Sequence, residues 1–303
     1  MNKIRENEAY KLIPHLLYDI PYALPSNASP ALKRQFHLAL TAYIHQDFHF
    51  ENISAYLEET DELNFSPDEA TQRDYCVDVL MTTIVQLTEL LKEFAPNCSG
   101  FDCFVYTNAM GRLRASFESC IILLRNGYYI ESSPILRLIY EQIAWSYSIM
   151  GKDRQEIERT KVTKQVGRLN DLIPGSSEMN GPYSQEAHLD PQKISSYTAI
   201  DEELGMVGYR YRSGSRSKEK FYDLFFLAKL YIRSIYKFAE RLDALDLDTV
   251  LPTPDKQLVC SVRERLALAE KSLAITLNHL CKIDGHDHDP TMPGLHIIED
   301  AMV

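Results

Sequence analysis

The sequence predicts an all-α fold, an irregular multi-helix bundle built around a central antiparallel helical hairpin. Apolar residues recur at helical spacing along most of the 303 residues, and convincing runs that alternate between apolar and polar residues are absent. Helix-start signals precede the periodic segments. Ser66-Pro67-Asp68-Glu69 is the strongest, because a capping serine stands before a proline and two acids that suit the positive end of a helix.

The expected helices follow from these signals in chain order. Ser29-Pro30 opens the first, and Ala95-Pro96-Asn97 ends the second. In the hairpin, Ser133 is expected to cap the second helix, with Pro134 in its first turn. The predicted helices cover residues 30–48, 67–94, 104–125, 134–150, 153–172, 184–188, 220–242 and 253–283, with loops at 173–182 and 209–220.

These segments suggest three regions. Residues 1–100 are expected to form an N-terminal helical region packed on the core, residues 101–283 the main helical domain, and residues 284–303 a C-terminal tail.

Composition restricts the class of protein. The formal net charge is −11, so a broad nucleic-acid-binding surface is not expected, although a local basic pocket is compatible with that total. The sequence shows no signal peptide and no run of 18 uncharged apolar residues, which predicts a cytoplasmic protein with no membrane span. Six scattered cysteines form no Cys-x-x-Cys pair, so free thiols and no disulfides are expected.

Three charged side chains fall on one line of the helix 104–125. On a wheel of 100° per residue, Arg114, Glu118 and Arg125 lie within 40° of one another. A broad apolar face lies beside this line. That face, which we expect to be buried, holds Tyr106, Met110, Leu113, Phe117, Cys120, Ile121 and Leu124.

The second helix of the hairpin, 134–150, is apolar nearly all round, which predicts burial. Arg137 and Glu141 are its main charged pair, and a buried arginine must be paired or bound. Because the connection NGYYIESS is short, the two helices should be antiparallel neighbours whose polar lines face one another.

Two interpretations of these lines remain open. The charges would form the intrahelical ion pairs Arg114–Glu118 and Arg137–Glu141, which only hold the helices in register. Alternatively they would line an anion-binding or catalytic pocket between the helices, with Tyr128 and Tyr129 at its mouth.

Several residues occur in an order that resembles a known family. The order is Arg114, Glu118-Ser119, Leu123-Leu124, Gly127, Leu136-Arg137 and Glu141, followed by Ser184 and His188 in a Ser-x-x-x-His arrangement. Over residues 105–190 it resembles a large, poorly characterised family of prokaryotic all-helical proteins known mainly as a domain of unknown function.

Some proteins of this appearance look like HEPN-type domains, which are often toxins, RNA-cleaving enzymes or defence components. The HEPN nuclease signature is arginine, four to six residues, then histidine, and none of the nine histidines here has an arginine five to seven positions before it. This departure argues against the usual HEPN route to RNA cleavage. It leaves open a split site in which Arg137 and His188 meet in space.

Further candidates lie outside the hairpin. Arg210, Arg212 and Arg216 belong to a basic run with glycine and serines, which would either wrap a phosphate or form a solvated loop. His45 and His49 have helical ligand spacing but lack the glutamate of a zincin. The histidine-rich stretch 284–289 with His296 could hold a divalent ion, although flexible termini of this kind usually hold none specifically. We therefore predict no metal and no cofactor.

The sequence leaves open whether the protein is an enzyme. The first hypothesis is a cytoplasmic binding or regulatory protein of a prokaryotic stress or defence system, whose Arg/Glu pocket takes a small anionic ligand or a partner segment. The alternative is a metal-independent RNA- or nucleotide-directed hydrolase that uses Arg137, Glu141 and His188 for catalysis. The third is a scaffold whose ion pairs fix helix register. A homodimer is compatible with all three.

Overall fold

The computed structural model describes the helical core and several flanking segments. The described residues are 12–17, 20–25, 28–45, 49, 67–94, 98–125, 128–187, 198–201, 206–209, 214–242 and 261–284.

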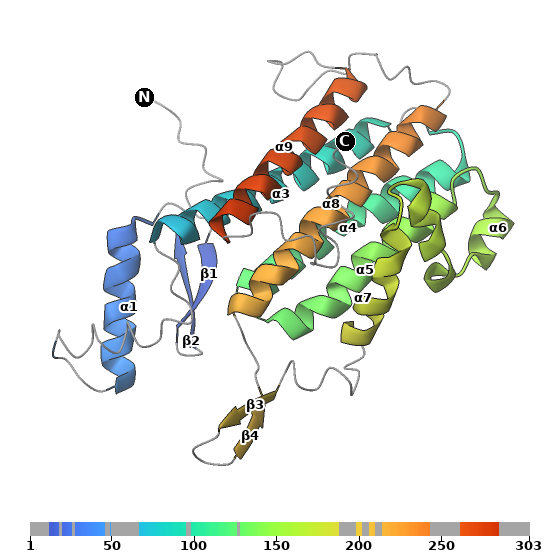
Figure 1. The fold of residues 1–303 in the computed structure, drawn as a ribbon. Helices are drawn as coiled ribbons and strands as arrows, with labels where there is room; N and C mark the ends of the chain where they lie inside the picture. Colours follow the sequence, from blue (N-terminus) through green and yellow to red (C-terminus); the bar gives the residue numbers. More distant parts are fainter. Residues whose placement is uncertain are drawn as a thin grey trace, which may run out of the picture.

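Helices dominate this part of the chain and form a multi-helix bundle, which confirms the predicted fold class (Figure 1). They are α1 (Pro30–His45), α3 (Pro67–Phe94), α4 (Phe101–Arg125), α5 (Tyr129–Ser148), α6 (Arg154–Arg159), α7 (Asn180–Ala187), α8 (Gly214–Arg241) and α9 (Val262–Ile283). Three 3₁₀ turns, η3 (Val162–Lys164), η4 (Val166–Asp171) and η5 (Ser176–Met179), link α6 to α7. Among these helices, none is long and apolar enough to cross a membrane.

Two short antiparallel hairpins accompany the bundle. They pair β1 (Leu12–Leu17) with β2 (Ile20–Pro25), and β3 (Thr198–Asp201) with β4 (Met206–Tyr209). The β3–β4 hairpin projects from the bundle in Figure 1. The sequence did not indicate these strands, because they are at most six residues long and prolines such as Pro14 and Pro21 interrupt any alternation.

The bundle is organised around α8. This helix contacts α3, α4, α5 and α9, and in Figure 1 it lies between the α3–α9 pair and the α4–α5 pair. From Phe221 to Ile232 every residue except Asp223 is buried. One continuous hydrophobic core joins residues of α3 to residues of the later helices. The division at residue 100 stays a prediction, although the core extends across it.

The central hairpin is formed by α4 and α5, which pack against each other. The Tyr128 N–H donates to the Leu123 carbonyl at 3.0 Å across the link between them. All seven residues that the wheel placed on the apolar face of α4 are buried. The spacing of apolar residues was therefore sufficient to orient this helix.

The start of α5 differs from the prediction. The helix begins at Tyr129, so Pro134 lies inside it and Ser133 is not its cap. A proline has no N–H to donate to the carbonyl four residues before it, which usually limits it to a first turn. Here Pro134 leaves the Ile130 carbonyl without its helical donor, and the hydroxyls of Ser132 and Ser133 donate to the preceding carbonyl, that of Tyr129, at 2.8 and 3.2 Å.

Two other helix boundaries also differ. The segment expected as one helix over 153–172 is the short α6 followed by 3₁₀ turns, and the extended backbone of Thr160 ends α6. The β-branched residues after this point and Gly167 disfavour a longer helix. Helix α8 starts at Gly214, so it includes residues expected in the basic loop. Its polar first turns carry no apolar periodicity that would have revealed them.

The shared core predicts a large effect of truncating Leu80, which is fully buried on α3. We expect Leu80→Ala to lower the free energy of unfolding by about 3 kcal/mol, because it leaves a cavity that the bundle fills only in part. Leu268 on α9 is 52% exposed, so Leu268→Ala is the matched control, with an expected loss below about 0.5 kcal/mol. Urea denaturation followed by circular dichroism measures both, and equal losses would contradict this description of the core.

Candidate functional site

The polar line of α4 faces α3. Arg114 pairs with Glu89 at 3.9 Å and Arg125 with Asp78 at 3.2 Å. The two arginines are eleven residues apart on α4, and their two partners are eleven residues apart on α3 in the reverse order. The antiparallel α3 therefore presents its carboxylates along the polar line of α4. The described partner of Arg114 is therefore Glu89, and the expected Arg114–Glu118 pair does not form.

Arg137 and Glu141 form the ion pair that their i,i+4 spacing predicts. Arg137 Nε donates to Glu141 Oε1 at 2.8 Å on α5, and both side chains are mostly buried. Glu118 is exposed on α4. These contacts bring Arg137 to Glu141 and the arginines of α4 to α3. A common pocket that includes all of them stays a prediction.

Several sequence candidates lie outside the described residues. They are His188, Arg210, Arg212, the side chain of Arg216, and the histidine-rich stretch beyond Asp284. Tyr128 is described and is half-buried in the link between α4 and α5. Among the described residues, no group of histidine, cysteine or acidic side chains could hold a metal ion. The described cysteines Cys76, Cys98, Cys103, Cys120 and Cys281 are free thiols.

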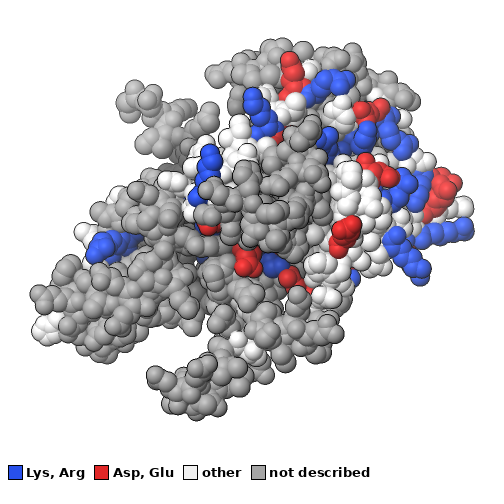
Figure 2. Space-filling view, in the orientation of Figure 1, with Lys and Arg blue, Asp and Glu red and all other residues white. Residues whose placement is uncertain are grey.

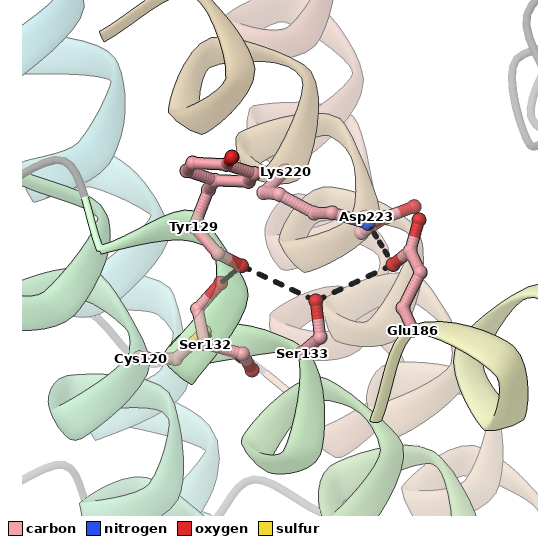
Figure 3. A network of polar contacts seen from close by, with 7 residues as sticks. All are labelled: Cys120, Tyr129, Ser132, Ser133, Glu186, Lys220 and Asp223. Carbon is pink, nitrogen blue, oxygen red and sulfur yellow. Dashed lines mark hydrogen bonds and ion pairs between the residues drawn. The ribbon is translucent and has the colours of Figure 1, made fainter. Parts of the chain in front are cut away.

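A cluster that the sequence did not identify lies where α5, α7 and α8 meet (Figure 3). We call it the α7 cluster; it comprises Ser133, Tyr183, Glu186, Lys220 and Asp223. Glu186 occupies the last turn of α7, and Lys220 and Asp223 lie one turn apart on α8. The cluster therefore joins segments far apart in the sequence around the buried part of α8.

One ammonium serves two carboxylates in this cluster. Lys220 Nζ forms an ion pair with Glu186 and lies 3.4 Å from Asp223 Oδ2. Ser133 Oγ lies 3.3 Å from Glu186 Oε2 and donates to it, so α5 also holds the end of α7 (Figure 3). Lys220 and Asp223 are 13% and 15% exposed and Glu186 is 31% exposed, which makes Glu186 the most accessible charge.

Burial sets the protonation of these groups. It raises the pKa of Asp223 to about 6, against the opposing effect of Lys220, and the nearby Glu186 carboxylate adds to the rise. For Lys220, burial favours a lower pKa, but the carboxylates of Asp223 and Glu186 outweigh it and raise the pKa above its ordinary value. Lys220 is therefore an ammonium near neutral pH, which is a poor nucleophile, whereas Asp223 exchanges a proton near pH 6.

Aromatic hydroxyls complete the surroundings. Tyr183 is 1% exposed, and among the described residues its hydroxyl has no hydrogen-bond partner of ordinary geometry. Burial, with Asp223, Tyr140 and Glu186 nearby, raises the pKa of Tyr183 well above its ordinary value, so it stays a neutral phenol. Its ring packs edge-on against Tyr140, with ring centroids 5.3 Å apart. The Tyr183 hydroxyl is nonetheless close enough to Asp223 to favour the ionised carboxylate.

A second polar group holds another side of α8. Tyr222 donates to Asp284 Oδ2 at 2.7 Å, and Asp284 forms an ion pair with Arg73 of α3. Asp284, expected at the start of the C-terminal tail, is thus buried against the bundle at the end of α9. Since Tyr222 and Asp223 are adjacent in sequence, polar contacts hold the first buried turn of α8 from two sides.

Charges of both signs cover the described surface. Residues 152–168 are rich in cations, but Arg154 is paired with Glu158 and the nearby Asp171 with Arg168, at 3.0 and 3.4 Å. Figure 2 shows Lys and Arg side chains mixed with Asp and Glu on the side where α6 lies in Figure 1. These cations are partly neutralised by their neighbours.

No protein-family model, curated protein or solved structure matches this chain. The resemblance to the family of unknown function, and through it to HEPN-type domains, therefore stays a prediction. The candidate site is therefore defined by the ion pairs and hydrogen bonds of the α7 cluster.

One signal for the α7 cluster was present in the sequence. Asp223 stands alone within the otherwise apolar run FYDLFFL, which a buried helix carries only if the acid is paired. Lys220, three residues before it, supplied a local partner and was counted instead with the basic loop. Glu186 is 34 residues from Lys220 in sequence, and only packing of α7 against the bundle brings the two together.

The cluster predicts that removing its only ammonium is costly. We expect Lys220→Met to lower the free energy of unfolding at pH 7.5 by about 3 kcal/mol, because two carboxylates then lose their common partner. The double variant Lys220→Met/Asp223→Leu should recover most of this loss, since it removes a buried charge together with its partner.

The matched control is Lys237 on the same helix. Its exposed ion pair with Glu240 has the same i,i+3 spacing as Lys220 and Asp223, at 2.9 Å. An exposed pair contributes below about 1 kcal/mol, so Lys237→Met should change stability little. Urea denaturation of the three variants tests this, and a double variant less stable than Lys220→Met would contradict the pairing.

Proposed function

We propose that the protein is a helical binding or regulatory protein that takes a ligand or a partner segment at the α7 cluster. The single observation that carries the proposal is one buried ammonium shared by two carboxylates, one of which lies beside the buried Tyr183 phenol. Apolar side chains at such positions often stabilise a fold as well or better, so stability alone is a weak explanation for them. Buried titratable groups with displaced pKa values are more frequent at functional sites than elsewhere.

The accessible part of the cluster supports the same proposal. Glu186 is its most exposed charge, and it stands at the end of a helix of only eight residues. An occupant would contact Glu186 first and reach Asp223 and Tyr183 by displacing the end of α7. By contrast, an anion at Arg114, Arg125 or Arg137 would have to compete with a carboxylate of the chain.

Native mass spectrometry of the purified chain tests the proposal. We expect a bound species on the wild type that is lost in Glu186→Gln, which removes the most exposed charge but keeps the shape of the side chain. Glu240→Gln is the matched control, because it breaks an exposed pair on α8, and it should retain the species. A wild type without any bound species, or one bound equally to all three proteins, would contradict the proposal.

The alternative is a metal-independent RNA- or nucleotide-directed hydrolase. The observation in its favour is Asp223, whose pKa of about 6 suits a general acid or base near neutral pH. If this function is correct, the wild type should cleave RNA or a nucleoside triphosphate in the presence of EDTA. Asp223→Asn should then slow the reaction by about 100-fold or more. A wild type inactive on both substrates counts against this alternative.

The cellular setting also belongs to the proposal. A role in a prokaryotic stress or defence system is what the family resemblance implies, and a cytoplasmic location agrees with the free thiols of the described cysteines. A homodimer stays a prediction that light scattering of the purified chain would decide.

A further inference from the structure

The α7 cluster contains one more negative charge than positive charge when both carboxylates are ionised, and one proton removes this difference. With Asp223 ionised, two carboxylates compete for the Lys220 ammonium; with Asp223 protonated, Lys220 and Glu186 form a balanced pair. Glu186 belongs to α7, whereas Lys220 and Asp223 belong to α8, so the balance determines how firmly one helix is held to the other.

We propose that Asp223 is a proton-sensitive latch for α7. When Asp223 is protonated, Lys220 pairs with Glu186 alone, and this ion pair holds the end of α7 against α8. Ionisation of Asp223 draws Lys220 toward its own carboxylate and repels Glu186, so α7 detaches more often. The latch would regulate access to the cluster at which we propose binding. Its effect on binding rests on that proposed function, whereas its effect on α7 does not.

Every element around Asp223 contributes to this balance. Lys220 on α8 favours the ionised form, whereas Glu186 on α7 opposes it. Tyr183 of α7 and Cys120 of α4 also face Asp223, and burial raises the pKa of both, so they stay neutral. The Tyr183 hydroxyl favours the ionised form of Asp223 by hydrogen bonding, but burial and Glu186 outweigh it. Ser133 of α5 brings a hydroxyl that does not titrate near neutral pH, and the Tyr140 hydroxyl of α5 donates away from the cluster to the Ser176 carbonyl. Asp223 is thus the group that changes charge between pH 5 and 7.5.

The sign of the effect follows from the raised pKa. Folded Asp223 has a pKa of about 6, above its ordinary 3.8, so the closed site binds the proton more tightly than an open one. Closure is then favoured at low pH and loses this contribution as the pH rises from about 4 to 6. This is the opposite of a carboxylate whose pKa is depressed by an ion pair, which acid weakens.

Hydrogen exchange of α7 tests the latch. After correction for intrinsic exchange rates, we expect the opening of Asn180–Ala187 to become on the order of tenfold more frequent between pH 5.0 and 7.5. Amides of α9 serve as the internal reference and should show no such change. Asp223→Asn, which carries no titrating group, should abolish the pH dependence in α7. Asp171→Asn, at an exposed ion pair of η4, is the matched control and should leave it intact.

A direct titration keeps the test decisive if Asp223→Asn does not fold. The side-chain carboxyl of Asp223, followed by ¹³C NMR in the wild type, should titrate near pH 6. A midpoint below about 4.5, or pH-independent opening of α7, would overturn the latch. If the latch fails in this way but native mass spectrometry still shows binding that depends on Glu186, the proposed function stands. If α7 shows the expected pH dependence but no bound species is found, the proposed function is wrong and the latch stands.

Discussion

The rest of the structure depends on the burial of α8. Four helices surround its middle, so each polar group that it carries must find a partner within the bundle. Tyr231 donates to the Met110 carbonyl at 3.1 Å, and Ser234 shares a hydrogen bond with Tyr106 at 2.9 Å. These neutral bonds fix the rotation of α8 against α4, and thereby the side on which Lys220 and Asp223 emerge.

The rotation explains why two polar groups flank the first buried turn of α8. Adjacent residues on a helix point about 100° apart, so Tyr222 and Asp223 cannot face the same neighbour. Tyr222 is directed to Asp284 and the α3–α9 side, whereas Asp223 is directed to α7. Asp284 is neutralised by Arg73 in a pair, but Asp223 shares its cation with Glu186. The two sides of α8 therefore differ in charge balance although both are polar.

Sequence reasoning succeeded where one helix determines the outcome and failed where packing does. The apolar face of α4 and the Arg137–Glu141 pair follow from spacing within a helix. The partners of Arg114 and Arg125 depend on how α3 lies beside α4, which no local pattern specifies. The early start of α5 was missed because Pro134 is a reliable first-turn signal and only the structure reveals it deeper in the helix. The α7 cluster was missed for the same reason as the α4 partners: Glu186 reaches Lys220 through tertiary packing.

Charge balance also separates the α7 cluster from the other polar contacts of α8. A neutral hydrogen bond between Tyr231 and a backbone carbonyl is satisfied at every physiological pH, and Asp284 has the Arg73 guanidinium and the Tyr222 hydroxyl as partners. One ammonium between two carboxylates retains a net negative charge unless a proton or another cation joins it. Deep inside the bundle such a charge would be too costly, whereas beside the partly exposed Glu186 it is tolerated. The end of α7 is therefore a place in the described bundle where a change of protonation alters how a helix is held.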